Sequence, residues 1–107
     1  MSAAHVNDPA RARFRQTLDA IYGDRLDRVV LFGSRVRGDA RADSDYDVAI
    51  FLRSLSNRWA EFDRLARLRV EIINETGAFF DAIPYLVDAW QERTPLMHQI
   101  RQDGVEL

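Results

Sequence analysis

The residues best suited to chemistry lie in one stretch, GSRVRGDARADSDYD, residues 33–47. Asp45 and Asp47 stand two positions apart where an apolar run begins, so a strand there would project both side chains from one face. Two carboxylates about 5 Å apart repel each other by roughly 1 kcal/mol in water, and by more near a protein interior. Paired carboxylate oxygens are hard ligands that suit Mg²⁺. The pair therefore predicts a magnesium site, with a solvated turn as the alternative.

The start of the same stretch predicts a site for an anion. Gly33 directly follows RVVLF, residues 28–32, an apolar run typical of a buried strand. A glycine at this point lets another group approach the backbone, and a helical turn opening at Ser34 would point its N–H groups at a phosphate. A phosphate cradle beside an acidic pair is suited to metal-assisted nucleotidyl transfer. Taken alone, the Gly-Ser pair is more typical of a turn that ends a strand, and it is the acidic pair at this spacing that favours the anion site.

Asp81 is the candidate for a third carboxylate. It stands within FFDAIPYL, residues 79–86, where a charge is costly unless it is paired or bound to a cation. If this run forms a strand beside residues 46–52, Asp81 can reach the same metal ions. The alternative is a charge on an edge strand that pairs with a basic side chain.

Three arginines within the loop allow two interpretations. Arg35, Arg37 and Arg41 could neutralise phosphate groups, or they could only balance the charges of Asp39 and Asp43. The residue types and their spacing do not separate these interpretations.

The elements that must position these residues alternate between helix and strand. Asn7 or Asp8, followed by Pro9, predicts a helix start, and Gly23 predicts its end. Strands are expected at 28–32, 46–52 and 79–86, with a helical turn at Ser34 and a helix over about 57–75. A last helix is expected from Ala89 to about Gln102, with Asp88 as its cap and Gly104 as its end. This order predicts an α/β (α+β) fold, a small mixed sheet flanked by helices.

Alternation and periodicity predict which side chains are buried. Within the strand 46–52, one face carries Tyr46, Val48, Ile50 and Leu52, and the other carries Asp47, Ala49 and Phe51. The helix after it has an apolar stripe of Phe62, Leu65, Leu68 and Ile72. Pro84 places the strand 79–86 at an edge or a bulge.

The composition restricts the class of protein. A chain of 107 residues that is 47% hydrophobic fits a single domain, residues 1–107, with a real core. The lack of cysteine suits a reducing, cytoplasmic setting, and no apolar run approaches the roughly 20 residues of a membrane span. The net charge of −2 disfavours a nucleic-acid partner.

The spacing Gly33-Ser34, ten residues, then Asp45-Tyr46-Asp47 resembles the signature of the DNA polymerase beta-like nucleotidyltransferase superfamily. The chain is similar in particular to the stand-alone minimal nucleotidyltransferases of prokaryotes. It shares their length, the Arg37-Gly38 pair, Ser44 before the first aspartate and the ending Ile100…Asp103-Gly104. The motif covers about 15 residues, and the looser order of elements covers most of the chain.

This resemblance implies a nucleotidyltransferase fold and a role for each residue of the motif. Gly33 and Ser34, with Arg37, would bind the phosphates of a nucleoside triphosphate. Asp45 and Asp47 would ligate two Mg²⁺ ions. Asp81 would match the third carboxylate of the family, which contacts the same ions and helps to deprotonate the attacking hydroxyl.

The resemblance also implies an activity and a partner. The chain would transfer a nucleotidyl group, AMP from ATP, to a hydroxyl of a partner protein, and would be the antitoxin of a HEPN-domain toxin. Three alternatives stay open: a non-catalytic binding module that silences its partner by occlusion, a catalytic subunit that acts on RNA or a small molecule with a separate substrate-binding subunit, and a scaffold with an incidental acidic pair. Self-association of the chain is also left open.

Overall fold

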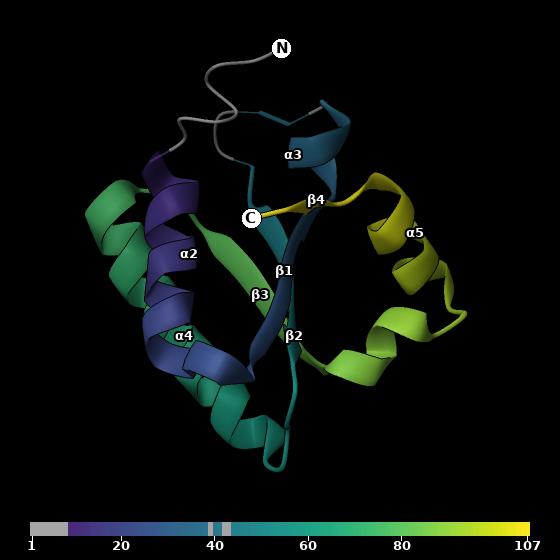
Figure 1. The fold of residues 1–107 in the computed structure, drawn as a ribbon. Helices are drawn as coiled ribbons and strands as arrows, with labels where there is room; N and C mark the ends of the chain where they lie inside the picture. Colours follow the sequence, from purple (N-terminus) through teal and green to yellow (C-terminus); the bar gives the residue numbers. More distant parts are fainter. Residues whose placement is uncertain (1–8, 39, 42–43) are drawn as a thin grey trace.

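In the computed structural model, which describes residues 9–38, 40–41 and 44–107, a four-stranded mixed sheet forms the centre of the molecule (Figure 1). The strand order is β3-β2-β1-β4, with β1 at Leu26–Phe32, β2 at Tyr46–Leu52, β3 at Phe80–Leu86 and β4 at Val105–Glu106. β1 runs antiparallel to both β2 and β4, whereas β2 and β3 are parallel. The predicted fold, a small mixed sheet flanked by helices, is confirmed.

Helices cover both faces of this sheet. Figure 1 shows α2 (Pro9–Tyr22) and α4 (Arg58–Thr76) on one side, and η2 (Val87–Gln91) and α5 (Pro95–Asp103) on the other. The single turn α3 (Ser34–Arg37) follows β1 at one end of the sheet, and the 3-10 turn η1 (Gly23–Arg25) joins α2 to β1. Within the described part of the chain, no helix is long and apolar enough to cross a membrane.

The central strand β2 is apolar on both faces, as its alternation predicts. Tyr46, Val48, Ile50 and Leu52 lie in the core cluster that includes residues of α2 and α4. Ala49 and Phe51 lie in the second cluster, with residues of η2 and α5. Because side chains alternate along a strand, Asp47 is on the same face as Ala49, the face that η2 and α5 cover.

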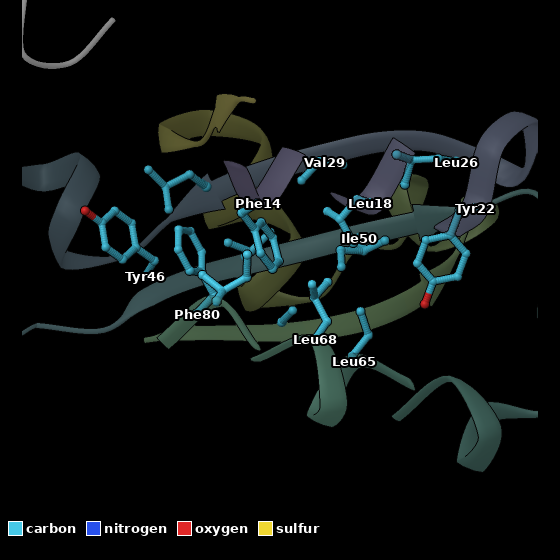
Figure 2. Packing of buried hydrophobic residues seen from close by; sticks show 14 of the residues in the cluster. Phe14, Leu18, Tyr22, Leu26, Val29, Tyr46, Ile50, Leu65, Leu68 and Phe80 are labelled. Carbon is cyan, nitrogen blue, oxygen red and sulfur yellow. The ribbon is translucent and has the colours of Figure 1, made fainter. Parts of the chain in front are cut away.

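A stack of three aromatic rings connects the core to the end of the sheet that carries the acidic residues. The ring of Phe80 lies between those of Phe14 and Tyr46, with centroids 4.3 Å and 4.4 Å away (Figure 2). Phe80 directly precedes Asp81 on β3, and Tyr46 separates the two aspartates of the Asp-Tyr-Asp sequence. The core therefore holds the backbone from which the candidate metal ligands project.

The apolar stripe predicted for α4 is wrong at its first position. Phe62 is 38% exposed, and the inward position of that turn is taken by Glu61, which is only 5% exposed. The buried residues of α4 are Glu61, Leu65, Leu68 and Ile72, which recur at helical spacing. Phe62, one residue further along the helix, is turned about 100° away from this stripe.

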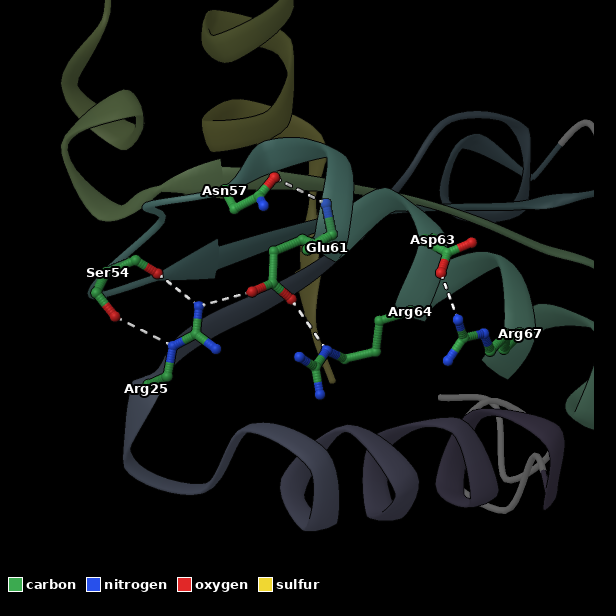
Figure 3. A network of polar contacts seen from close by, with 8 residues as sticks. Arg25, Ser54, Asn57, Glu61, Asp63, Arg64 and Arg67 are labelled. Atoms are coloured by element: carbon green, nitrogen blue, oxygen red, sulfur yellow. Dashed lines mark hydrogen bonds and ion pairs between the residues drawn. The ribbon is translucent and has the colours of Figure 1, made fainter.

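The buried Glu61 is stabilised by two arginines. Arg25 Nη2 donates to Glu61 Oε2 at 2.9 Å, and Arg64 Nε lies 3.3 Å from Glu61 Oε1 (Figure 3). Arg25 also donates to the carbonyl oxygen of Ser54 at 2.8 Å. The network thus joins η1, the segment after β2 and the first turn of α4, at the end of β2 opposite to Asp47.

The prediction of one continuous last helix is also wrong. The chain forms η2, then α5, which begins at Pro95 with Thr94 as its N-cap. The Thr94 hydroxyl accepts from the N–H of Met97 at 3.1 Å. Proline has no N–H and disfavours helical backbone at the preceding residue, so Pro95 starts a new helix instead of continuing one. Asp88 accordingly lies inside η2 and does not cap the helix.

The remaining boundaries differ only slightly from the prediction. β1 begins at Leu26, two residues earlier than expected, and β3 begins at Phe80. The strand β4 was not predicted, because two residues are too few to show alternation. The predicted start of the first helix at Asn7 or Asp8 lies outside the described residues.

Candidate active site

Gly33 and Asp47 meet at the end of the β1–β2 pair. The register places Phe32 opposite Asp47, so Gly33 follows immediately beside this aspartate. Gly33 is buried, its φ is 82°, and a Cβ added to it would overlap Oδ2 of Asp47. Both the backbone conformation and the contact therefore require glycine at this position.

Gly33 also closes the turn that carries Ser34. Its carbonyl oxygen accepts from the N–H groups of Val36 and Arg37, each at 3.1 Å. The turn ends at Gly38, whose φ is 88°. The predicted helical turn at Ser34 is thus present and lies directly beside Asp47; the binding of phosphates by Gly33 and Ser34 stays a prediction.

The parallel pairing of β2 and β3 brings a second carboxylate to this place. Asp81 is the register partner of Asp47, and register partners on adjacent strands face the same side of the sheet. The expectation that the strand of Asp81 lies beside the strand of Asp47 is confirmed. β3 is also the edge strand of the sheet, one of the two positions that Pro84 predicted.

The electrostatics of Asp47 show that the acidic residues lie within range of one another. Its pKa is raised above the ordinary 3.8 by burial first, then by the charges of Asp81 and Asp45, and Arg37 partly opposes the increase. A bound cation would relieve this repulsion, and carboxylate oxygens are suitable ligands for Mg²⁺. The donor set therefore fits the predicted ion.

The acidic residues are nevertheless not gathered into a closed cluster. Across the residues that the structure describes, no three His, Cys, Asp or Glu side chains form a group that could hold a metal ion. Asp81 instead pairs with Arg69 of α4, whose Nη1 lies 3.7 Å from Asp81 Oδ1. The ion-pair interpretation of Asp81 is thus also realised in the structure.

The loop arginines have different environments. Arg35 donates two hydrogen bonds to the carbonyl oxygen of Ser44, at 3.2 Å and 2.7 Å, and its guanidinium lies 4.2 Å from the ring centroid of Tyr46. It therefore ties α3 to the start of β2. Arg37 is exposed and lies close enough to lower the pKa of Asp47, which suits the predicted contact with phosphate. Asp39 and Asp43 lie outside the described residues, so their pairing with the arginines stays untested.

Ser44, which the resemblance singles out without giving it a role, forms two hydrogen bonds with Arg41. Its hydroxyl accepts from the N–H of Arg41 at 2.8 Å, and its own N–H donates to the Arg41 carbonyl at 3.1 Å. These two hydrogen bonds tie Ser44 to Arg41 just before Asp45. The serine before the first aspartate is a signal of this contact in the sequence, because serine favours turns.

A cavity of about 450 Å³ lies between the start of α2, the end of α4, and Arg35 and Tyr46. Tyr46 faces α2 and α4, whereas Asp47 faces the opposite side of the sheet. The cavity is therefore separate from the acidic site.

The sequence matches the nucleotidyltransferase domain family over residues 11–101. It is also similar to a Methanocaldococcus jannaschii protein provisionally named protein adenylyltransferase MJ0141, with 45% identity over 42 residues. That segment is 39% of this chain and 42% of the relative, so the similarity spans less than half of the relative's length.

Solved structures with the same fold include three that bear on the prediction. A protein provisionally described as a minimal nucleotidyltransferase has 26% identity and a TM-score of 0.61, with 94% of each chain covered. A toxin–antitoxin with AMP-PNP has 19% identity, a TM-score of 0.62, and coverage of 88% of this chain and 69% of that one. A tri-AMPylated Shewanella oneidensis HEPN toxin in complex with its MNT antitoxin has 15% identity, a TM-score of 0.55, and coverage of 91% and 70%.

The last two are too distant in sequence to show more than a common fold. The minimal nucleotidyltransferase at 26% identity and the family match together confirm the predicted resemblance to minimal nucleotidyltransferases. The match over residues 11–101 covers most of the chain. The chain belongs to the nucleotidyltransferase domain family.

Proposed function

We propose that this chain is a Mg²⁺-dependent nucleotidyltransferase that transfers AMP from ATP to a hydroxyl group of a partner protein. The observation that carries the proposal is the meeting of Gly33, Asp47 and Asp81 at one end of the sheet. A relative provisionally named a protein adenylyltransferase and a toxin–antitoxin structure with AMP-PNP support the choice of reaction and nucleotide.

The residues of the motif divide between the nucleotide and the metal ions. Two bound Mg²⁺ ions would stabilise the charges on the attacking and leaving oxygens of an in-line displacement. Their ligands would be the carboxylates of Asp45, Asp47 and Asp81. Gly33, Ser34 and Arg37 would contact the triphosphate, with Arg37 supplying a positive charge.

The reaction itself exchanges one phosphorus–oxygen bond for another. The oxygen of the acceptor hydroxyl forms a bond to the α-phosphorus, the bond from that phosphorus to the α,β-bridging oxygen breaks, and pyrophosphate leaves. The hydroxyl proton passes to the carboxylate of Asp81. Because Gly33 has no side chain, the Asp47 carboxylate fits directly against its backbone.

The partner that we propose is a HEPN-type toxin, with this chain as its antitoxin, in the cytoplasm. The support is the common fold with an MNT antitoxin bound to an AMPylated HEPN toxin. The absence of cysteine suits a reducing compartment.

A second candidate function is neutralisation of the partner by occlusion, without catalysis. The pairing of Asp81 with Arg69 favours this function, because the arginine already balances the charge of the carboxylate without a metal ion. The two functions differ in their need for the acidic residues. Replacing Asp45 and Asp47 together by alanine should leave neutralisation intact if the chain only occludes its partner, and should abolish it if transfer is required.

Thermal stability against a panel of nucleoside triphosphates, each with and without Mg²⁺, tests the proposed site. A ligand that binds only the folded state raises its stability, by about 2.7 kcal/mol at a hundredfold excess over the dissociation constant. We expect ATP with Mg²⁺ to raise the melting temperature of the unaltered chain but not of Asp47→Asn. Asp63→Asn, the same change at an exposed carboxylate of α4, is the matched control and should behave as the unaltered chain. An equal shift in Asp47→Asn, or no shift with any triphosphate at millimolar concentration, would overturn the site.

A further inference from the structure

Asp81 has one partner that the structure shows, Arg69, and a second that the proposed function requires, a bound cation. Phe80 and Ala82 lie in the core cluster beneath α4, so Asp81, between them, faces the other side of the sheet. Arg69 belongs to α4 and yet contacts Asp81, with 3.7 Å between Nη1 and Oδ1. Because β3 is an edge strand, the arginine can reach around its open side to make this contact.

The ring of Phe79 helps to hold Arg69 in this position. The guanidinium carbon of Arg69 lies 5.0 Å from the ring centroid of Phe79, which is within range of a cation–π interaction. Phe79 directly precedes β3 and is two positions from Asp81, so the two contacts act on the same arginine from neighbouring points of the chain. The pairing therefore follows from the way in which α4 packs on β3, and not from one exposed side chain alone.

The second partner of Asp81, under the proposed function, is a cation bound between Asp81 and Asp47. Asp47 is the register partner of Asp81 on the adjacent strand, so a rotamer of Asp81 that points toward β2 would bring its carboxylate toward Asp47. Because Arg69 reaches Asp81 from the open side of β3, such a rotamer would take the carboxylate away from Arg69. In the described part of the chain the acids are not assembled into a metal-binding group, and the ion pair is the arrangement that is present.

We propose that Arg69 is a positioning residue that competes with the cation site for Asp81: it holds the carboxylate at the sheet edge and must release it for the site to form. This inference rests on the proposed function, because it takes Asp81 as the third metal ligand. Arg69 would thereby weaken the binding of a divalent cation alone, and the full site would form when the cation and the negatively charged triphosphate act together.

The solvent exposure of Arg69 and Asp81 determines how strongly Arg69 should weaken cation binding. The side chains of Arg69 and Asp81 are 36% and 48% exposed, and ion pairs in such surroundings contribute little to stability. Removing the arginine should therefore tighten cation binding by only about two- to fivefold. This is enough to measure and small enough to leave the fold intact.

Titration of the full chain with Mn²⁺ alone, with free Mn²⁺ measured by electron paramagnetic resonance, tests the proposal. We expect Arg69→Gln to bind Mn²⁺ about two- to fivefold more tightly than the unaltered chain. The matched control is Arg67→Gln, which removes the same charge from the same helix but from an arginine that pairs with Asp63. It should leave the dissociation constant unchanged, and both variants should keep the melting temperature of the unaltered chain.

A second pair of variants tests whether Arg69 acts through Asp81. In the Asp81→Asn background, Arg69→Gln should no longer tighten Mn²⁺ binding, because the carboxylate for which arginine and cation compete is gone. An equal gain in Arg69→Gln and Arg67→Gln, a gain that persists with Asp81→Asn, or no gain at all would overturn the inference.

The same titration separates this inference from the proposed function. If Mn²⁺ binds and Asp47→Asn weakens that binding, the cation site stands whatever Arg69 does. If no variant shows Mn²⁺ binding that depends on Asp47, the cation site itself is overturned, and the role of Arg69 is overturned with it.

Discussion

At the scale of single residues, Gly33 and Asp47 constrain one another. The glycine adopts a φ of 82°, which other residues rarely adopt, and its missing side chain leaves the space that the Asp47 carboxylate fills. The pKa of Asp47 is raised by burial and by Asp81 and Asp45, so its charged form is unfavourable in the folded protein. The raised pKa is a cost to the fold, and a bound cation would remove that cost.

Replacing Gly33 by alanine should therefore damage stability and ligand binding together. Strain at such a φ costs about 1–3 kcal/mol, and overlap with Asp47 adds to it. Gly77→Ala is the control, because Gly77 also has a positive φ of 79° but a Cβ there would meet nothing within 4 Å. We expect both variants to lose free energy of unfolding in urea titrations, but only Gly33→Ala to lose stabilisation by ATP with Mg²⁺. Loss of ligand binding in both would indicate an effect of stability alone.

Replacing Asp47 by asparagine should have opposite effects on stability and activity. A carboxyl whose pKa is raised by folding destabilises the folded state once the pH is above its ordinary pKa of 3.8, so removing the charge should raise the melting temperature at pH 7. The gain should vanish near pH 3, where the carboxyl is protonated in both states. Transfer should fall by roughly a thousandfold or more, since a metal ligand contributes several kcal/mol to the transition state. A less stable variant that keeps its activity would contradict both expectations.

At the scale of the elements, the network around Glu61 fixes the first turn of α4. Burial alone would raise the pKa of this carboxyl, but the hydrogen bond from Arg25 and the charges of Arg25 and Arg64 outweigh it, so the pKa is lowered. The neighbouring Tyr22 phenol has its pKa raised well above 10.0, chiefly by burial and then by Glu61. The first turn of α4 is thus fixed by the ion pairs of Glu61, whereas the other buried residues of this helix are apolar.

Glu61→Gln should lower the free energy of unfolding by about 1–3 kcal/mol at pH 7, because it leaves Arg25 and Arg64 without the opposite charge that they face in the folded protein. A lowered pKa means that the contribution of Glu61 is complete above its ordinary value of 4.5 and is lost as the pH falls through the lower folded value. The difference between the two proteins should therefore shrink between pH 5 and pH 3 in urea titrations. A difference that stays constant over this range would show that the charge of Glu61 is not involved.

The elements also show what sequence could and could not predict. The loop of residues 33–47 could be located because its chemical groups are close together in the chain and follow a strand. Phe62 was misplaced because periodicity alone does not reveal that Glu61 is paired inward with Arg25. The contact between Arg69 and Asp81 depends on how α4 packs against the edge strand, which only the tertiary structure fixes.

At the scale of the whole molecule, one core supports the site from beneath. The stacked rings of Phe14, Phe80 and Tyr46 join α2, β3 and β2 (Figure 2). They lie on the sheet face opposite to Asp47 and Asp81. In contrast, Trp59 and Phe62 of α4 are 83% and 38% exposed. The size of an aromatic residue therefore does not by itself indicate how much it contributes to the stability of the fold.

Phe80→Ala should lower the free energy of unfolding by about 3–5 kcal/mol, as expected for a fully buried phenylalanine. Trp59→Ala should change it by no more than about 0.5 kcal/mol, because the side chain is mostly in solvent. Chemical denaturation of the two variants provides the comparison. Similar losses in both would mean that Trp59 packs against the molecule more closely than its exposure indicates.

Transfer of a labelled nucleotide tests the central claim most directly. The chain is incubated with Mg²⁺, a HEPN-domain protein as the proposed acceptor, and ATP labelled at either the α- or the γ-phosphate. We predict that label from the α-phosphate alone becomes bound to the partner, that chelation of Mg²⁺ prevents this, and that Asp47→Asn transfers none. A partner that is bound and neutralised without ever acquiring the α-label would contradict the proposed reaction and leave occlusion as the function.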